Sequence, residues 1–174
     1  GKAGKEDLHL RAAPLSTVLR EAAEPHLARG KEVIFTLAPG MKGESSEPII
    51  QRRPELIHGV RNLVQNAVDF AHSRVWVDAS WTARNLTLRI IDDGEGYPPG
   101  VLGRIGDPFV RARRSAQDIS ARPGYEGMGL GLFIAKTLLE RTGADLSFAN
   151  AGDPFLTPEE RPDRSGAIVE VIWP

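Results

Sequence analysis

The run Ile90-Ile91-Asp92-Asp93-Gly94-Glu95-Gly96-Tyr97 decides how the rest of the sequence is interpreted. It begins as an apolar strand that ends in a carboxylate, and two glycines then alternate with other residues. The ordinary interpretation is a strand followed by an Asp-Gly turn, which is common. In the functional interpretation, Asp92 accepts a hydrogen bond from a ligand, while Gly94 and Gly96 let the backbone approach that ligand closely. This run alone leaves both interpretations open.

The strongest helical pattern begins at Pro54 and is expected to end near His72. Its apolar residues share one face, and Asn62 and Asn66 lie one turn apart on the opposite face. An ordinary solvated helix face explains this pattern too. Asn is nevertheless a poor residue for a helix interior, and its carbonyl oxygen is a hard ligand that suits Mg²⁺. The other polar residues of this face are His58 and Asp69.

A third motif, Gly127-Met128-Gly129-Leu130-Gly131-Leu132, enters a helix that is expected to end at Arg141. Glycines before a helix N-terminus favour an anion site, because free N–H groups and the positive end of the helix dipole coincide there. A dinucleotide-binding fingerprint requires the spacing G-x-G-x-x-G directly after a strand, which this motif lacks. It is not a Walker A loop either, since no Gly-Lys-Ser/Thr follows.

The remaining chain alternates short strands with one further helix. Because strands and helices mix without regular βαβ alternation, we expect an α+β fold, with a mixed sheet and helices on one face. Long loops are expected from Gly96 to about Gly127 and from Ala151 to Ser165. The other expected elements are a helix over Leu15–Ala28 and strands over Glu32–Ala38, Ile49–Ile50, Arg74–Ser80, Asn85–Ile91, Ala144–Ala149 and Ala167–Trp173.

Composition excludes several classes of protein. The chain has 174 residues, a formal net charge of -1 and no cysteine, so neither nucleic acid as a bulk partner nor a disulfide framework is indicated. No apolar stretch approaches the ~20 residues of a membrane span. The sequence starts at Gly1 rather than Met, so we expect it to be a piece of a longer protein.

The three motifs, taken in order, resemble the N, G1 and G2 boxes of the gyrase, Hsp90, histidine-kinase and MutL ATPase superfamily. Gly106-Asp107-Pro108-Phe109-Val110-Arg111 is similar to the F box of histidine kinases, and Ser165-Gly166-Ala167 to their G3 element. The stretch from Phe109 through Gly131 is similar to the redox-responding RegB/PrrB sensor kinases. The resemblance implies one catalytic domain over residues 1–174. It would have a two-layer α/β sandwich of the Bergerat type, about five strands, about three helices on one face, and a lid over about 97–127.

The resemblance also implies a role for each motif residue. Asn66 would hold the Mg²⁺ that bridges the ATP phosphates, and Asn62 would support the phosphates or the metal. Asp92 would accept a hydrogen bond from the adenine amine, with Gly94 and Gly96 shaping the base pocket. The lid and its hinges would contribute Phe109, Arg111, Gly127, Gly129, Leu130 and Gly131, with Arg111 touching the phosphates.

The implied activity is protein-histidine kinase activity in a two-component signalling system. The γ-phosphoryl group of ATP would pass to a His on a separate phosphoacceptor and dimerisation domain, and from there to a response regulator. None of the four histidines of this chain lies in an acceptor-like helix; they are His9, His26, His58 and His72. We therefore expect a cytoplasmic, monomeric fragment of a homodimeric parent that is anchored in the inner membrane.

Two positions depart from the family pattern. Asp69 stands where many histidine kinases carry a phosphate-facing Lys, so another base is needed. Asn62 stands where the gyrase and Hsp90 branches carry a water-activating Glu, which favours phosphoryl transfer over hydrolysis. Two alternatives remain open: a Ser/Thr-directed kinase of the anti-sigma type, and a nucleotide-binding module without transfer activity. The candidate bases are Arg111, Arg113, Arg114, His72 and Lys136.

Overall fold

The computed structural model describes residues 11–98, 100–102, 128–151 and 163–174. Its main sheet has five strands in the order β2-β4-β5-β7-β6, and β1 pairs with β3 in a separate two-stranded sheet. The strands are β1 (Ala12–Pro14), β2 (Glu32–Pro39), β3 (Ile49–Gln51), β4 (Arg74–Trp81), β5 (Leu86–Asp92), β6 (Asp145–Asn150) and β7 (Ala167–Trp173).

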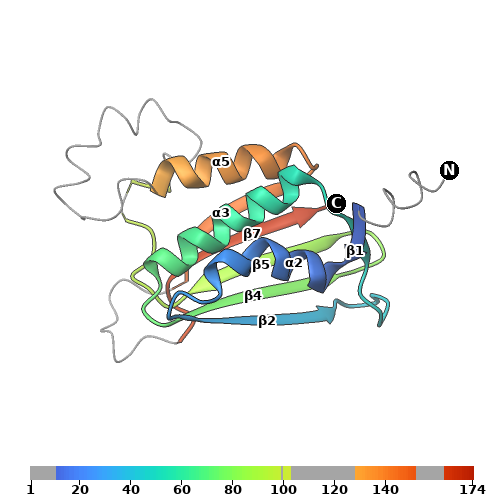
Figure 1. Cartoon of the computed structure of the whole chain (residues 1–174), viewed down its shortest axis with the longest axis horizontal. Helices are drawn as coiled ribbons and strands as arrows, with labels where there is room; N and C mark the ends of the chain where they lie inside the picture. The colour runs from blue at the N-terminus through green and yellow to red at the C-terminus, as the bar shows by residue number, and fades with distance from the viewer. Residues whose placement is uncertain (1–10, 99, 103–127, 152–162) are drawn as a thin grey trace.

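Three α-helices lie on one face of the main sheet: α2 (Leu15–Ala23), α3 (Pro54–Phe70) and α5 (Met128–Glu140), as Figure 1 shows. Strand β2 runs parallel to β4, and the other neighbouring strands of the main sheet are antiparallel. The predicted α+β sandwich with a mixed five-stranded sheet and three helices on one face is therefore confirmed. The core lies between these two layers.

The position of α3 follows from its sequence. Pro54 occupies the first turn, where its missing N–H is harmless. The apolar face of the helix packs onto the sheet, and the amide-bearing face points away from it. The buried residues of α3 are Leu56, Gly59, Val60, Leu63, Val64, Ala67 and Val68.

One predicted element boundary differs from the structure by more than two residues. The first helix was expected to continue to Ala28, but α2 ends at Ala23, and a short 3-10 turn, η1 (Glu24–His26), follows it. Pro25 explains the early end, because it has no N–H to donate to the carbonyl of Glu21. Arg61 of α3 uses the backbone oxygens left free there, donating to Ala22 at 3.0 Å and to Glu21 at 3.2 Å. Strand β1 was also not predicted.

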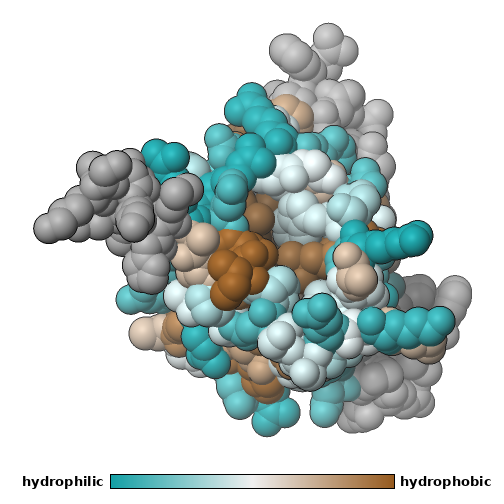
Figure 2. Space-filling view, turned by 90° about the vertical axis from the view of Figure 1, so that its right-hand side faces the viewer, coloured by the Kyte–Doolittle hydropathy of each residue, from teal (hydrophilic) through white to brown (hydrophobic). Residues whose placement is uncertain are grey.

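The N-terminal end of α3, the start of β5 and the end of β7 meet at one end of the molecule, which Figure 2 views directly. Hydrophobic side chains gather near the middle of this end. None of the helices in the described part of the chain has the length and apolar character of a membrane span. A small hollow is lined by Leu15, Leu19, Ile50, Leu56, Val60, Ala79, Leu86, Leu88 and Trp173.

Gly59 of α3 packs directly against Leu139 of α5. A Cβ atom added at Gly59 would be 2.5 Å from Cγ of Leu139, which is fully buried. The glycine therefore allows α3 and α5 to pack side by side. This contact holds the helix that carries the third motif against the helix that carries the two asparagines.

A double-mutant cycle tests this contact. Gly59→Ala should lower the free energy of unfolding by about 1–3 kcal/mol, because the added methyl overpacks the core. Leu139→Ala should lower it by about 2–5 kcal/mol by leaving a cavity. In the Leu139→Ala background, Gly59→Ala should be stabilising, since the methyl fills that cavity and Ala favours the helix. Urea denaturation of the four proteins measures this, and an equal effect of Gly59→Ala in both backgrounds would contradict the contact.

Candidate functional site

Asp92, the last residue of β5, is 3% exposed and carries the buried carboxylate of the site. Its Oδ1 accepts hydrogen bonds from the backbone N–H of Gly94 at 2.9 Å and of Ala167 at 3.1 Å. Among the described residues, no donor reaches Oδ2. The protein therefore holds the carboxylate by one oxygen, which leaves the other as an acceptor for a ligand.

Two glycines make room for this carboxylate. A Cβ added at Gly166 would lie 2.0 Å from Oδ1 of Asp92, and one added at Gly94 would lie 2.1 Å from the carbonyl oxygen of Phe70. The N–H of Gly166 also donates to the carbonyl of Asp92 at 2.9 Å. Any side chain at Gly94 or Gly166 would push apart the backbone segments that surround Asp92.

Burial raises the pKa of Asp92 from 3.8 to about 6. The hydrogen bonds from Gly94 and Ala167 oppose this rise, the nearby charge of Asp93 adds to it, and His72 lowers the pKa slightly. The group is thus ionised at neutral pH, although burial disfavours its charge. A ligand N–H that donates to Oδ2 would relieve part of that penalty.

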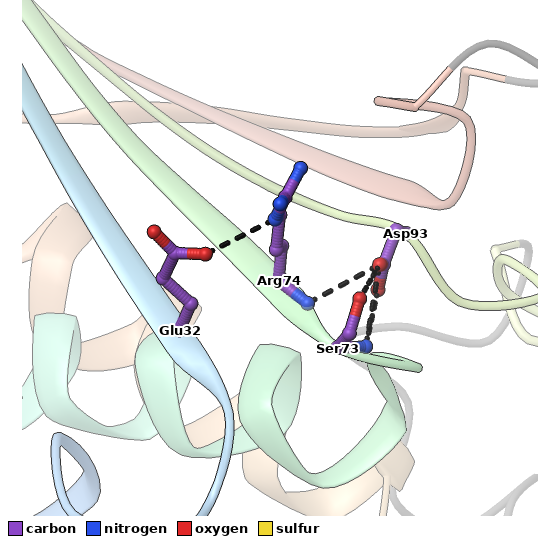
Figure 3. Close-up of polar contacts among 4 residues, drawn as sticks. All are labelled: Glu32, Ser73, Arg74 and Asp93. Atoms are coloured by element: carbon purple, nitrogen blue, oxygen red, sulfur yellow. Dashed lines mark hydrogen bonds and ion pairs between the residues drawn. The ribbon is translucent and has the colours of Figure 1, made fainter.

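Asp93 ties the same strand end to the turn between α3 and β4 (Figure 3). Its Oδ1 accepts from the backbone N–H of His72 at 2.8 Å and of Ser73 at 3.0 Å. Its Oδ2 accepts from the Ser73 hydroxyl at 2.7 Å and from the Arg74 N–H at 3.2 Å. Burial alone would raise the pKa of Asp93, but these donors outweigh it and the pKa is lowered. The sequence interpretation assigned Asp93 no role.

Arg74 extends this anchor to the neighbouring strand. Its Nε donates to Glu32 of β2 at 3.1 Å, as Figure 3 shows. This ion pair is well exposed, so its contribution to stability is small. The carboxylate of Asp93, with its backbone donors, is the stronger connection.

Asn62 and Asn66 lie partly exposed on α3, as predicted. Neither amide makes a hydrogen bond to another residue in the described ranges. The end of β5, the C-terminal end of α3 and the first turn of α5 lie at the same end of the molecule (Figure 1). The fold therefore places the last turns of α3, which carry Asn66 and Asp69, at the same end as the Asp92 carboxylate.

Asp69 is not an isolated negative charge on this face. Its carboxylate accepts from Nη2 of Arg29 at 2.5 Å, and Nη1 of Arg29 lies 3.1 Å from Nδ1 of His26. Lys31 adds a second positive charge, donating to the carbonyl of Val68 at 2.5 Å. Arg29 was missing from the candidate bases, because it precedes Asp69 by forty positions in the sequence and carries no motif.

The five residues that the sequence offered as the phosphate-facing basic residue lie in different surroundings. Lys136 forms an ion pair with Glu140 one turn along α5. His72 is exposed beside the Asp93 anchor, where its backbone N–H is used. The three remaining candidates, Arg111, Arg113 and Arg114, lie outside the described residues.

Gly96 and Tyr97 are held by Asn150 at the end of β6. The Asn150 side chain accepts from the Tyr97 N–H at 2.6 Å and donates to the Tyr97 carbonyl at 3.2 Å. Gly96 has a φ of +87°, and a Cβ there would lie 2.7 Å from Oδ1 of Asn150. Tyr97 is buried, with its ring edge-on to Phe148. Asn150 thus fixes the backbone just beyond the glycines, a role that no sequence signal indicated.

The glycine-rich helix start is placed as predicted, within the limits of the described chain. Gly129, Leu130 and Gly131 lie in the first turn of α5, and Leu130 is 42% exposed. A Cβ at Gly131 would meet open space. The predicted contributions of Phe109, Arg111 and Gly127, and residues 103–127 of the predicted lid, lie outside the described residues.

Comparison with known proteins places this arrangement in a family. The protein-family model described as "Histidine kinase-, DNA gyrase B-, and HSP90-like ATPase" matches residues 51–174 of the sequence. The chain is 68% identical over its whole length to the sensor histidine kinase RegB of Cereibacter sphaeroides, and it spans 38% of that protein. It is also 36% identical to the sensor protein QseC of Escherichia coli over 94 residues, 53% of this chain and 18% of QseC.

Solved structures show the same fold. The mycobacterial sensor histidine kinase MprB superposes with a TM-score of 0.64 at 22% identity, covering 94% of this chain and 95% of that one. The catalytic domain of histidine kinase ThkA gives 0.61 at 15% identity, covering 94% of each chain. The chain therefore belongs to the family of histidine kinase-, DNA gyrase B-, and HSP90-like ATPases, and its relative with 68% identity is a sensor histidine kinase.

Proposed function

We propose that residues 1–174 form one catalytic domain that binds Mg²⁺-ATP and donates its γ-phosphoryl group to a histidine on a separate phosphoacceptor domain. The observation that carries this proposal is the Asp92 carboxylate, buried and held by one oxygen between two backbone N–H groups. The chain spans 38% of the length of its RegB relatives, so the acceptor and sensor regions are proposed to lie elsewhere in a longer protein.

At the base end, Oδ2 of Asp92 accepts a hydrogen bond from the exocyclic amine of adenine. This acceptor selects adenine over a base that presents a carbonyl at the same position, because two acceptors repel. Gly94 and Gly96 shape the base pocket through the backbone, because a side chain there would meet the Phe70 carbonyl or the Asn150 side chain. Asp92 binds and orients the nucleotide and takes no part in bond formation.

At the phosphate end, the amide oxygens of Asn62 and Asn66 fit a hard cation that takes few protein ligands. Asn66 is the proposed metal ligand, and Asn62 supports the metal or the phosphates. When bound, Mg²⁺ would neutralise charge on the phosphate oxygens. The first turn of α5 offers N–H groups to the phosphates. The proposed contacts of this end are completed by Phe109, Arg111, Gly127, Gly129, Leu130 and Gly131.

Arg29 is proposed as the basic residue that compensates the negative charge of Asp69 near the phosphates. Its guanidinium is bound to the Asp69 carboxylate at 2.5 Å, so the polar face of α3 carries a compensated pair rather than a bare acid. A guanidinium has five N–H donors, and the contacts to Asp69 and His26 leave donors for a phosphate. This pairing weakens the argument from Asp69 for a nucleotide-binding module without transfer activity.

The outward face of α5 is proposed to dock the helical phosphoacceptor domain. Leu130 and Ile134 lie one turn apart on this helix and are 42% and 40% exposed. Residues 128–135 of this helix are all apolar, as expected for a segment whose outer face is covered by a partner. This apolar stripe begins in the turn proposed to hold the phosphates, so a helix docked there would bring its histidine near the γ-phosphoryl group.

In the parent protein, we propose the arrangement of a two-component sensor. The phosphoacceptor domain would dimerise, and its phosphohistidine would pass the phosphoryl group to a response regulator. The domain would face the cytoplasm, with the parent anchored in the inner membrane and responding to redox state, as the RegB relationship suggests. The isolated chain would be a monomer, and nucleic acid is not a proposed partner.

The phosphotransfer proposal is tested with the chain, a dimerisation domain carrying the acceptor histidine, Mg²⁺ and γ-labelled ATP. The label should move to the partner and be acid-labile but base-stable, because the product is a phosphohistidine. Asn66→Ala should abolish transfer. Acid-stable label would favour the Ser/Thr-directed alternative, and ATP binding without any labelled partner would contradict the proposal.

Asp92→Asn should weaken ATP binding at least about tenfold by calorimetry, since the acceptor becomes partly a donor.

The Asp92→Asn change should also stabilise the nucleotide-free domain at pH 7.5, raising its free energy of unfolding by up to about 3 kcal/mol. Folding raises the pKa of Asp92 from 3.8 to about 6. The contribution of Asp92 to the stability of the wild-type protein is therefore lost as the pH rises between these two values. The gain should disappear near pH 4; a gain that persists there would contradict the assigned cause.

Ile134→Glu should reduce phosphoryl transfer at least about tenfold by placing a charge in the docking interface. ATP affinity should be unchanged, because Ile134 lies one turn beyond the glycine-rich start of α5. Met41→Glu is the matched control, since Met41 is 87% exposed on a loop far along the chain. Equal transfer rates in the Ile134→Glu and Met41→Glu proteins would refute this docking face.

A further inference from the structure

The face of the main sheet that no described helix covers carries two cross-strand rows of side chains. Trp76 of β4 and Ile91 of β5 are register partners in the first row, and they are 6% and 7% exposed. Asp78, Arg89 and Glu170 lie side by side in the second row, on β4, β5 and β7. We call this surface the open face of the sheet.

Arg164 lies across this open face, from the turn just before β7. Its Nη1 donates to Oδ2 of Asp78 at 2.5 Å, and its Cζ lies 5.1 Å from the centroid of the Trp76 ring. The planar guanidinium suits both contacts at once, since it stacks on an aromatic face while pairing with a carboxylate. Oδ1 of Asp78 is buried without a hydrogen-bond partner among the described residues, so the carboxylate is held through its Oδ2 contact with Arg164.

The chain passes from Arg164 directly into the Asp92 site. Two residues later, Gly166 donates its N–H to the Asp92 carbonyl at 2.9 Å, and Ala167 donates to Oδ1 at 3.1 Å. This segment has little freedom, because even a Cβ at Gly166 would lie 2.0 Å from Oδ1. Ser165, which lies between Arg164 and Gly166, is 7% exposed.

We propose that Arg164 is a positioning residue for nucleotide recognition: clamped to Asp78 and Trp76 on the open face, it fixes the backbone of Gly166 and Ala167 that aims the Asp92 carboxylate. This inference rests on the proposed role of Asp92 toward adenine. Arg164 touches neither the nucleotide nor the reacting atoms. It acts by keeping the backbone N–H groups of Gly166 and Ala167 in place.

The chain offers a matched control on the same face. Arg89 donates through Nε to Glu170 at 2.7 Å. Its side chain is 57% exposed, compared with 44% for Arg164, and the partner carboxylates Glu170 and Asp78 are both 26% exposed. Arg89 lies in the middle of β5, and its partner Glu170 lies within β7 rather than in the turn before that strand. Loss of either arginine removes one cation of the open face, but only Arg164 lies just before Gly166 and Ala167, which donate to Asp92.

The experiment measures Mg²⁺-ATP affinity by calorimetry for wild type, Arg164→Ala, Arg164→Lys and Arg89→Ala, with thermal melts of each nucleotide-free protein. Arg164→Ala should bind ATP about tenfold more weakly, because Asp92 loses its fixed orientation. Arg164→Lys keeps the ion pair but loses the planar contact with Trp76, so its affinity should be intermediate. Arg89→Ala should bind like wild type.

The pH dependence of ATP affinity separates positioning from a loss of stability. Wild-type affinity should fall as pH decreases through about 6, where Asp92 is protonated. Weakening the Ala167 hydrogen bond removes one contribution that lowers the pKa of Asp92, so the midpoint should move upward in Arg164→Ala. The other charges near Asp92, Asp93 and His72, are unchanged in every variant, and so is the titration of the nucleotide phosphates.

The outcomes distinguish this inference from the proposed function. If wild type binds ATP and Asp92→Asn does not, the role of Asp92 stands, and the arginine variants then decide the positioning role. Wild-type affinity and an unshifted pH midpoint in Arg164→Ala would overturn it, as would equal losses in Arg164→Ala and Arg89→Ala. If Arg164→Ala does not fold, Arg164→Lys with wild-type affinity and pH midpoint would overturn it equally.

Discussion

The buried carboxylate of Asp92 must stay charged beside the backbone of β7, and the residues around it follow from that constraint. Burial raises its pKa to about 6, so its charge at neutral pH depends on the N–H groups of Gly94 and Ala167. Those donors reach it only because positions 94 and 166 lack side chains. The glycines are therefore part of the electrostatics of the site as well as of its shape.

Two anchors on opposite sides hold this arrangement in place. The Asp93 carboxylate accepts hydrogen bonds from backbone N–H groups and a hydroxyl in the turn between α3 and β4. The end of β5 therefore cannot move independently of the helix that carries the two asparagines. On the other side, Arg164 pins the entry of β7 to the open face. A domain that keeps a costly charge at its ligand site needs such supports, because local strain persists only where surrounding contacts determine it.

The sequence was sufficient for the layers of the fold and for the elements that carry the motifs, because both depend on local patterns. The face of α3, the strand before Asp92 and the glycine-rich start of α5 all follow from periodicity and spacing. Pro25 was a sequence signal for the end of α2 at Ala23, but the apolar period that continues beyond it was misleading.

The supports could not be predicted, since each joins residues distant in the chain. Arg29 precedes Asp69 by 40 positions, Asn150 follows Tyr97 by 53, and Arg164 follows Asp78 by 86. No local pattern marks such pairs, and only the register of the sheet and the packing of α2 on α3 bring them together. Arg29 also changes the meaning of Asp69, which looked unfavourable for phosphate binding when read without its partner.

The central claim is that Asp92 recognises the exocyclic amine of adenine. Its most direct test compares, by calorimetry at pH 7.5, the binding of ATP and of purine riboside triphosphate, which lacks only that amine, to wild type and to Asp92→Asn. Wild type should prefer ATP by at least about tenfold, and Asp92→Asn should lose that preference. Equal affinity of wild type for the two nucleotides would contradict the account.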